Sequence, residues 1–558
     1  MNEYDVCVIG SGAGGGPVAL TLAQAGASVV VLEKGPWYTE KSFFKDEKGD
    51  CRYTPDLRDE QHVVEERDED TGTWTSTPTS ESGWSFWNGN MVGGSSNLMS
   101  GFFTRLKPDD FRLLSVFGAV KGANVVDWPI GYEDLEPYYA KVESVVGVSG
   151  EVVPHPHAEP RSTPDFPYPP THEHFLSKFI DRTCEKLGYH ALPLPRAILS
   201  RPDMGRQSCQ YSGYCGSYGC ASGAKGSARA ALLDHAVETG RCDIRPRAQV
   251  QRLISDRTGK VTAADYVDAK GKTQTIRARI FVIACQAIET SRLMLLSVGP
   301  QHAQGLGNRY GQVGKNLIFS AGGSGRGEFS YARFTPEQAR DLKQIGPFVN
   351  RHIQDWYFYT DPKTGRRTKG GTIDFLLRHP NPFNRAQGLR RDVDGNLLWG
   401  SALKTRLLED FTQTQSLGFE VFNDWHPTDD CYVSLDSAVR DKWNVPVAKI
   451  RLNAHPRDLE VGEYLSEKAV RVMRAMGAET ITSSVSPSPP ANLVAGGCRF
   501  GENPETSVLD ADCRVHTAEN VFVTDGSFMP TGGSVPYTWT IYANAFRVAD
   551  IIKRQLSL

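Results

Sequence analysis

The chain has 558 residues, with 62 lysines and arginines against 65 aspartates and glutamates, and a net charge of −3. It is too long for one ordinary hydrophobic core, so we expect two closely joined domains. Because the net charge is close to zero, there is no reason to expect nucleic acid or an anionic membrane surface as a partner. With no apolar run of membrane-spanning length and no basic and apolar leader, we expect a cytoplasmic protein, or a periplasmic one if it is exported with a signal-bearing partner subunit.

The first 35 residues predict a strand, a glycine turn, a helix and a second strand. Apolar runs at 4–9 and 27–32 flank the glycine-rich stretch 10–16 and an apolar helical stretch that ends at Gly26. In such a turn Gly10 permits the tight bend, and Gly12 lets the backbone approach a pyrophosphate. A helix N-terminus then offers free N–H groups to the phosphates.

An acid follows the second strand, as a dinucleotide site requires. Glu33 stands where a carboxylate can accept hydrogen bonds from both ribose hydroxyls, and Gly15 lets the helix and strand pack closely. The same carboxylate argues against a bound 2′-phosphate, which leaves FAD or NAD. The alternative reading is a simple structural turn.

Several later blocks carry a family resemblance. They include Gly93-Gly94-Ser95-Ser96-Asn97, Pro108-Asp109-Asp110-Phe111, the stretch 127–139, the stretch 283–295 and Val521-Phe522-Val523-Thr524-Asp525-Gly526. In this order they resemble the glucose-methanol-choline (GMC) flavoprotein oxidoreductases, and within them the gluconate, glucose and fructose dehydrogenase large subunits. The resemblance spreads over nearly the whole chain and implies that the dinucleotide is FAD.

The resemblance also implies an FAD site built from distant segments. Its residues would be Gly10, Gly12, Ala13, Gly15, Glu33, Gly94, Ser95, Ser96, Asn97, Val250, Asp525, Gly526 and Thr538. Some relatives join the flavin covalently to a histidine just after the glycine-serine turn. Here the stretch 97–100 contains no histidine, so we expect non-covalent FAD.

The expected fold class is α/β, or α+β overall, with a Rossmann-like FAD-binding domain and a substrate domain built on a mostly antiparallel sheet. The FAD domain would be discontinuous, over 1–35, 80–105, 205–320 and 490–558. The substrate domain would cover 106–204 and 321–489. The polar stretch 36–79 lacks periodicity and predicts surface loops or a lid. Strands are expected near 245–267, 280–284, 372–377 and 419–422, and helices at 226–239 and 459–476.

Three cysteines lie close together with glycines between them. Cys209, Cys215 and Cys220 can converge as thiolates on a soft metal centre, because glycine lets the backbone wrap around it. The segment resembles a four-cysteine pattern of gluconate-dehydrogenase-like chains, with Ser212 in place of one cysteine, and the resemblance implies a [3Fe–4S] cluster. A cysteine-containing loop with one disulfide or none is the alternative.

Two His-X-His pairs occur at 155–157 and 172–174. Such a pair can clamp a metal when it lies on a strand, since both rings then face one side. The surrounding prolines favour a loop, where these pairs are solvated.

The family's acid–base residues are missing from this sequence. Where relatives carry a histidine this chain has Leu493, and where they carry an asparagine or a second histidine it has Pro536. Neither can accept a proton, although hydroxyl oxidation needs a base within hydrogen-bond reach. His426, Asp424 and Tyr537 are the replacement candidates, with Cys498 as a further one; loop, pocket-wall and core roles are the alternatives.

The resemblance implies an FAD-dependent dehydrogenase that oxidises the CH–OH group of a sugar, glycoside or related small alcohol by hydride transfer to flavin N5. Electrons would pass to a non-oxygen acceptor, with a small subunit and a cytochrome as partners. Two alternatives stay open. One is flavin-dependent dehydrogenation of a C–C or C–N bond without the histidine base, and the other is a catalytically decayed flavin-binding subunit.

Overall fold

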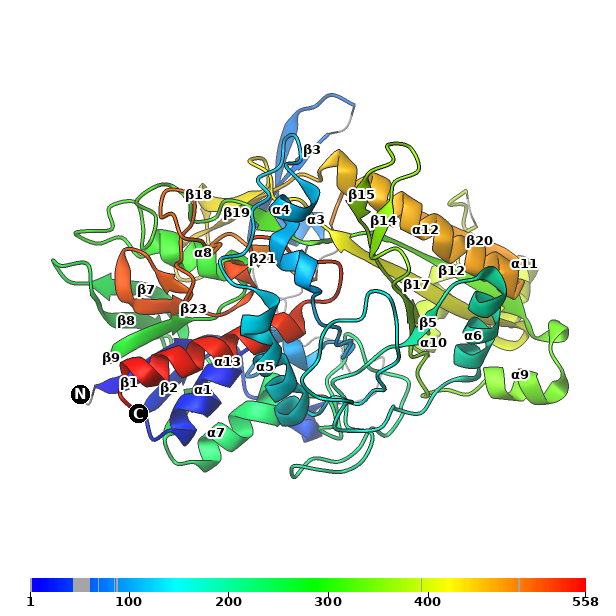
Figure 1. Ribbon diagram of the computed structural model, residues 1–558, viewed down its shortest axis with the longest axis horizontal. Coiled ribbons are helices and arrows are strands. Elements are labelled where there is room, and N and C mark those ends of the chain that lie inside the picture. Colours follow the sequence, from blue (N-terminus) through cyan, green and yellow to red (C-terminus); the bar gives the residue numbers. More distant parts are fainter. Residues whose placement is uncertain are drawn as a thin grey trace.

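The computed structural model describes residues 3–43, 61–68, 70–84, 86, 89–392, 394–489 and 492–558. Figure 1 shows two halves side by side, with both termini in the half on the left. That half contains the parallel strands with helices α1 and α13, and the other half contains an antiparallel sheet beneath helix α12. The expected fold class is confirmed.

The left half is built on an eight-stranded sheet, counted over the described residues, in the order β22-β23-β9-β1-β2-β6, with β8 paired to β9 and β7 paired to β8. Its strands are β1 (Tyr4–Ile9), β2 (Val29–Leu32), β6 (Cys242–Arg245), β7 (Gln249–Ser255), β8 (Val261–Val267), β9 (Thr273–Ile283), β22 (Arg514–Val515) and β23 (Ala518–Val523). The pairs that flank β1 are parallel, as are β2 with β6 and β23 with β9. Buried valines and isoleucines fill these central strands, as is usual for parallel strands.

Helices α1 (Gly15–Gln24), α5 (Tyr132–Val142), α7 (Asp234–Glu238), α8 (Ala287–Leu296) and α13 (Thr538–Gln555) belong to this half. α13 packs on both α1 and α5. The helix expected at 226–239 forms as a π-helical turn, η5 (Arg229–Leu233), followed by α7. The strands expected at 245–267 form as the hairpin of β7 and β8. Strands from the two ends of the chain, such as β1 and β23, belong to the same sheet.

The right half is built on a seven-stranded sheet in which every pair is antiparallel. Its strands are β5 (Ala191–Pro193), β11 (Ser320–Ala321), β12 (Gly323–Ser330), β13 (Arg351–Ile353), β16 (Gly371–Leu376), β17 (Thr414–Asp424) and β20 (Thr480–Val485). Helix α12 (Pro456–Met476) buries an apolar face on this sheet and ends at Gly477, whose φ of 85° favours glycine. Helix α6 (Phe175–Leu187) packs on α12.

Part of the stretch expected to be loop or lid forms strands instead. β3 (Val63–Arg67) and β4 (Trp74–Pro78) pair as a hairpin, and β3 pairs in parallel with β19 (Pro446–Leu452), which pairs with β18 (Tyr432–Arg440). The sequence of this hairpin does not show the apolar alternation typical of strands, because the hairpin projects from the body of the protein and buries only a few side chains. Residues 44–60 of the expected lid lie outside the described residues.

The remaining described elements are short. They are η1 (Glu40–Ser42), α3 (Thr79–Ser82), η2 (Gly94–Asn97), η3 (Pro108–Arg112), α4 (Leu113–Phe117), η4 (Glu143–Gly147), β10 (Leu317–Ile318), η6 (Tyr331–Arg333), α9 (Pro336–Leu342), β14 (Phe358–Thr360), β15 (Arg367–Lys369), α10 (Pro382–Gly388), α11 (Gly400–Leu408), η7 (Glu409–Gln413), β21 (Ala495–Gly496) and η8 (Gly526–Phe528). Over the described ranges, no helix combines the length and the apolar character needed to cross a membrane.

Candidate active site

A cavity of about 270 Å³ begins at the glycine turn after β1 and reaches the wall between the two halves. Gly10, Gly12, Ala13 and Glu33 line one end of it. Leu493, Pro536, Tyr537, Glu420 and Phe422 line it as well, and the last two come from β17 of the antiparallel sheet. The cavity therefore lies beyond the carboxyl ends of β1 and β2, where open α/β sheets bind their ligands.

The turn after β1 needs glycine at defined positions. Gly10 has a φ of 95°, and a Cβ there would lie 2.2 Å from the backbone oxygen of Ala284. A Cβ on Gly15 would lie 2.1 Å from the Gly10 oxygen. Gly12 differs, since its nearest neighbour is the Cα of Gly94 at 3.8 Å, and a side chain there would extend into free space. Two glycines serve the turn and one leaves room for a ligand.

Glu33 connects the first turn to the glycine-serine turn. Its carboxylate accepts hydrogen bonds from Ser11 N at 3.1 Å, Ser11 Oγ at 2.6 Å and Gly35 N at 2.9 Å. Ser11 Oγ in turn accepts from the backbone N–H of Gly93 at 3.0 Å. Burial raises the pKa of Glu33. A carboxylate has more lone pairs than these bonds use, so ribose hydroxyls can still bind it.

Most of the other residues predicted to bind FAD line the cavity, and one of them holds the glycine-serine turn in place. Ser95, Ser96, Val250, Asp525, Gly526 and Thr538 line the cavity. Asn97 does not line it; its Nδ2 donates to Val92 O at 2.9 Å and Gly94 O at 3.1 Å and so holds the glycine-serine turn. Asp525 accepts hydrogen bonds from Ser527 N and Thr290 Oγ1, and burial raises its pKa. The structure thus brings segments from both ends of the chain around one cavity.

The replacement acid–base candidates lie in different places. Tyr537 lines the cavity, and its buried hydroxyl has no hydrogen-bond partner among the described residues. His426 is not a lining residue; its Nδ1 pairs with Asp458 at the start of α12. Asp424 is buried outside the lining set, with Lys369 Nζ 4.0 Å away. Burial raises the pKa of both Asp424 and Tyr537. Cys498 is fully buried in the core.

Glu420 is a cavity residue that the sequence reasoning missed. It lies on β17 in the stretch 419–422 that was expected only as a strand, and no family block marks it. It is partly exposed, and it lines both this cavity and a second one. The sequence could have indicated Glu420 in one way, because an acidic residue is unusual within a strand whose neighbouring residues are apolar.

His352 lies two strands away from Glu420 in the same sheet and is expected to make stability depend on pH. Burial, together with the charges of Lys107, His155 and Arg351, lowers its pKa to about 3. The unfolded chain binds a proton near the ordinary value of 6.5. The free energy of unfolding should therefore fall as the pH drops from about 6.5 towards 3, by on the order of 4 kcal/mol from this group. Urea titrations at neutral pH and at about pH 4.5 should show a smaller difference for His352→Gln than for the wild type.

The three cysteines line the second cavity, of about 550 Å³, which shares Ser100, Phe102 and Glu420 with the first. Burial and the neighbouring thiols raise the pKa of Cys209 to about 12, whereas Lys225 contributes to a lowered pKa of Cys220. Lys225 Nζ donates to the backbone oxygens of Asn97, Cys215 and Tyr218 at 2.7–3.1 Å. This buried ammonium ties the cysteine loop to the glycine-serine turn.

Histidines of the two His-X-His pairs are engaged in loop and cap contacts. His155 Nε2 lies 3.2 Å from Asp355 Oδ1, and His190 Nδ1 lies 2.7 Å from the same oxygen. His155 Nδ1 accepts from the backbone N–H of His157, so its Nε2 carries the proton and donates to Asp355. His174 caps α6, and His172 stacks on Tyr211. The predicted loop placement is confirmed for the first pair.

Comparison with known proteins decides the family. Models described as "GMC oxidoreductase" match residues 68–320 and 427–545, and a model described as "FAD binding domain" matches residues 5–44. The chain belongs to the GMC oxidoreductase family. As a GMC oxidoreductase it is an FAD-dependent enzyme, which confirms the predicted cofactor.

Relatives of this GMC oxidoreductase cover almost its whole length. It is 31% identical to 2-methyl-1,2-propanediol dehydrogenase of Mycolicibacterium austroafricanum, over 100% of this chain and 96% of that protein. It is 31% identical to paromamine 6′-oxidase of Streptomyces fradiae, over 99% and 92%. It is 26% identical to the fructose dehydrogenase large subunit of Gluconobacter japonicus, over 83% and 80%. Formate oxidase, a solved structure, shares its fold with a TM-score of 0.63, 15% identity and coverage of 100% and 99%.

The cavity suits the cofactor of this GMC oxidoreductase. Gly12 leaves free space beside the N-terminus of α1, where backbone N–H groups and the helix dipole favour phosphate. Gly94 has a φ of 58°, and a Cβ on it would lie 2.9 Å from Gly12 Cα, so both turns approach as only glycines can. The cavity then continues past Asp525 to Tyr537. The residues along the cavity therefore suit the dinucleotide part of FAD at the glycine turn and the flavin ring at the other end.

Proposed function

We propose that this enzyme oxidises the CH–OH group of a sugar, glycoside or related small alcohol. The observation that carries the proposal is one continuous cavity with a phosphate-suited glycine turn at one end and polar and apolar groups of the second half at the other. The relatives named for 2-methyl-1,2-propanediol, fructose and paromamine support this substrate class. FAD, held by the glycine turn and the residues that line the cavity, would supply the acceptor for a hydride from the carbinol carbon.

The residues at the far end of the cavity would bind and orient the hydroxyl group. The Tyr537 hydroxyl is buried and lacks a partner among the described residues, so a substrate oxygen would supply one. Its pKa is raised well above 10, so it remains a donor at neutral pH. The charge of Asp424 contributes to this shift, which makes Asp424 a positioning residue in this proposal. Leu493 and Pro536 would pack on the substrate and exclude water.

The test is anaerobic reduction of the FAD-loaded enzyme. A panel of 2-methyl-1,2-propanediol, fructose, methyl glucosides and paromamine should include at least one compound that bleaches the visible flavin band. Bleaching by a saturated acid or an amine but by no alcohol would favour dehydrogenation of a C–C or C–N bond instead. A flavin that dithionite reduces and no organic substrate reduces would favour a decayed subunit.

We further propose that Cys209, Cys215 and Cys220 hold an iron–sulfur cluster as the electron exit to a non-oxygen acceptor. Three thiol-bearing residues line one roomy cavity that adjoins the flavin cavity, and Lys225 holds their loop in place. Three thiolates suit a [3Fe–4S] cluster. A small subunit and a cytochrome would then receive the electrons, an arrangement in keeping with a relative named as a large subunit.

Cys215→Ser should lose bound iron and its paramagnetic signal while it keeps FAD, because serine is a poor ligand for iron in such clusters. The measurement is iron per chain, with the electron paramagnetic resonance spectrum. Cys184→Ser is the matched control, since that cysteine is buried in the core of the second half. Equal iron content in the Cys215 variant and the wild type would remove the cluster proposal.

A further inference from the structure

Three titratable side chains form a row across neighbouring strands of the antiparallel sheet. His352 on β13 lies opposite Asp374 on β16, and Asp374 lies opposite Glu420 on β17. Directly opposed residues of neighbouring strands project from the same face of a sheet. His352 Nδ1 is 3.8 Å from Asp374 Oδ1. The row therefore runs from the interior of the second half to the wall of the flavin cavity.

The two carboxyl groups of this row lack ordinary partners. Asp374 is 1% exposed, and neither of its oxygens has a hydrogen-bond partner within the described ranges. Glu420 has no hydrogen bond or ion pair with a described residue, and no neighbouring charge contributes to the shift of its pKa. Arg196 is the cation that faces Asp374, but it donates to Asn350 Oδ1 and Ser100 O and lies between the rings of Phe102 and Phe348.

Two neighbouring carboxyl groups, of which one is buried and the other only partly exposed, cannot both ionise at low cost. Burial raises the pKa of Glu420, and burial together with the Glu420 charge raises that of Asp374. The arrangement therefore favours a state in which Asp374 keeps a proton and Glu420 carries the negative charge. In that state Glu420 is a proton acceptor with a raised pKa, and a base with a raised pKa suits general base catalysis.

Other acidic groups of the cavity are already engaged. Glu33 is bound by Ser11 and Gly35, and Asp525 by Thr290 and Ser527. Glu289 pairs with His62 at 3.1 Å and with Arg292 at 3.4 Å. No histidine occurs among the described residues that line the cavity. Glu420 is the lining carboxylate, among those described, that is free to accept a proton.

We propose that Glu420, paired with Asp374, is the acid–base residue that accepts the proton of the substrate hydroxyl where relatives use a histidine. The inference rests on the proposed oxidation of a CH–OH group. The O–H bond breaks and its proton passes to a Glu420 carboxylate oxygen. The C–H electron pair leaves the same carbon as hydride, for which the family's FAD is the acceptor, and the carbon becomes a carbonyl. Asp374 is a positioning residue that keeps a proton beside the Glu420 carboxylate.

The test uses the FAD-loaded enzyme and whichever alcohol of the panel reduces the wild type. E420Q should reduce its flavin at least about 100-fold more slowly, with a KM within a few-fold of the wild type. D374N should retain most of the rate, because the amide leaves the Glu420 carboxylate as the proton acceptor, and its resting infrared spectrum should lack the band of a protonated carboxylic acid at this pair. E328Q is the matched control, since Glu328 lies on β12 of the same sheet and lines neither cavity.

A second readout needs no turnover. The infrared spectrum of the resting protein at neutral pH should contain a protonated carboxylic acid band that the double variant E420Q/D374N lacks. Equal reduction rates in E420Q and the wild type, a rise in KM alone, or an unchanged infrared band in the double variant would overturn the assignment. If no alcohol reduces even the wild type, the proposed function fails, and the infrared band alone decides whether the pair shares a proton.

Discussion

Gly12→Ala should fold normally and lose FAD. A methyl group at Gly12 meets no protein atom closer than 3.8 Å, and the residue does not have a positive φ, so the fold can accept it. The methyl would occupy the space beside the N-terminus of α1 that a pyrophosphate needs. We expect a loss of roughly 3 kcal/mol in FAD binding, or about 100-fold in Kd. The measurement is flavin content after purification, with fluorescence titration of the apoprotein.

Gly388→Ala is the matched control for this change. Gly388 is exposed at the end of α10, its added Cβ would meet nothing within 4 Å, and it lies far outside the cavity lining. It should bind FAD like the wild type. Full flavin content in Gly12→Ala, together with a normal melting temperature, would show that the cofactor does not lie against this turn.

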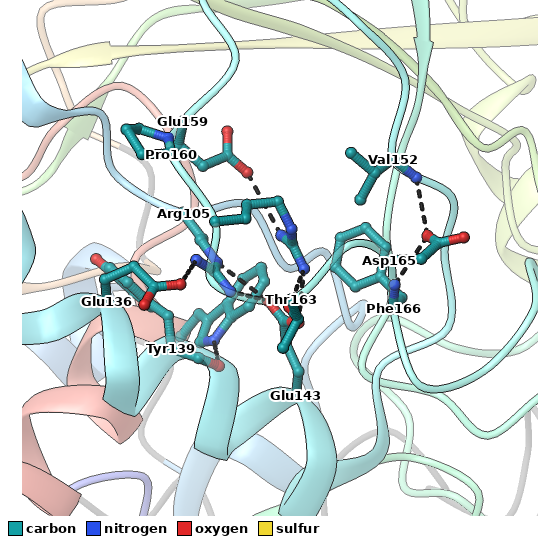
Figure 2. A network of polar contacts seen from close by, with 12 residues as sticks. Arg105, Glu136, Tyr139, Glu143, Val152, Glu159, Pro160, Thr163, Asp165 and Phe166 are labelled. Carbon is teal, nitrogen blue, oxygen red and sulfur yellow. Dashed lines mark hydrogen bonds and ion pairs between the residues drawn. The ribbon is translucent and has the colours of Figure 1, made fainter.

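Arg105→Met should destabilise the folded protein by about 3–5 kcal/mol. Arg105 is 0% exposed and donates to Glu143 Oε1 at 3.0 Å and Glu136 Oε1 at 2.9 Å (Figure 2). It also donates to the Tyr132 hydroxyl at 3.2 Å. The substitution keeps an apolar stem of similar length but leaves the carboxylate of Glu143, which is 1% exposed, with Arg161 as its one remaining ion-pair partner among the described residues. An unbalanced buried charge is costly, so the free energy of unfolding in urea should fall.

The same network supplies an internal check. Arg105→Met combined with Glu143→Gln removes the stranded charge and should recover part of the lost stability. Arg340→Met is the surface control, because its partner Glu337 is 3.9 Å away and both side chains are more than 70% exposed. That change should stay within about 0.5 kcal/mol. A loss for Arg105→Met no larger than the control's would contradict this account of the buried arginine.

Sequence patterns predicted the parts of the fold in which local chemistry and burial agree. The turn at 10–16, the hairpin β7–β8 and helix α12 all form as expected, because glycine, turn residues and apolar periodicity act over short distances. The hairpin β3–β4 was read as loop because its polar strands take their place from pairing with β19, some 385 residues away. Such long-range pairing leaves no local signal.

The site was predictable to a similar degree. Family motifs marked the residues around the FAD cavity, and most of them line it. Motif spacing could not identify Glu420, because its neighbour Asp374 is 46 positions earlier and only the register of β16 on β17 brings the two together. His426 and Asp424 lie two positions apart in the sequence, but neither lines the cavity, because His426 pairs with Asp458 of α12 and Asp424 lies beside Lys369.

The central claim is that this cavity presents the carbinol C–H bond of an alcohol to FAD. Its most direct test is the rate of anaerobic flavin bleaching in a single turnover, measured with an alcohol and with the same alcohol deuterated at the carbinol carbon. The account predicts complete bleaching by one equivalent and a clearly slower rate with the deuterated compound, because the C–H bond breaks in that step. Bleaching at identical rates with both compounds, or none with any alcohol, would contradict it.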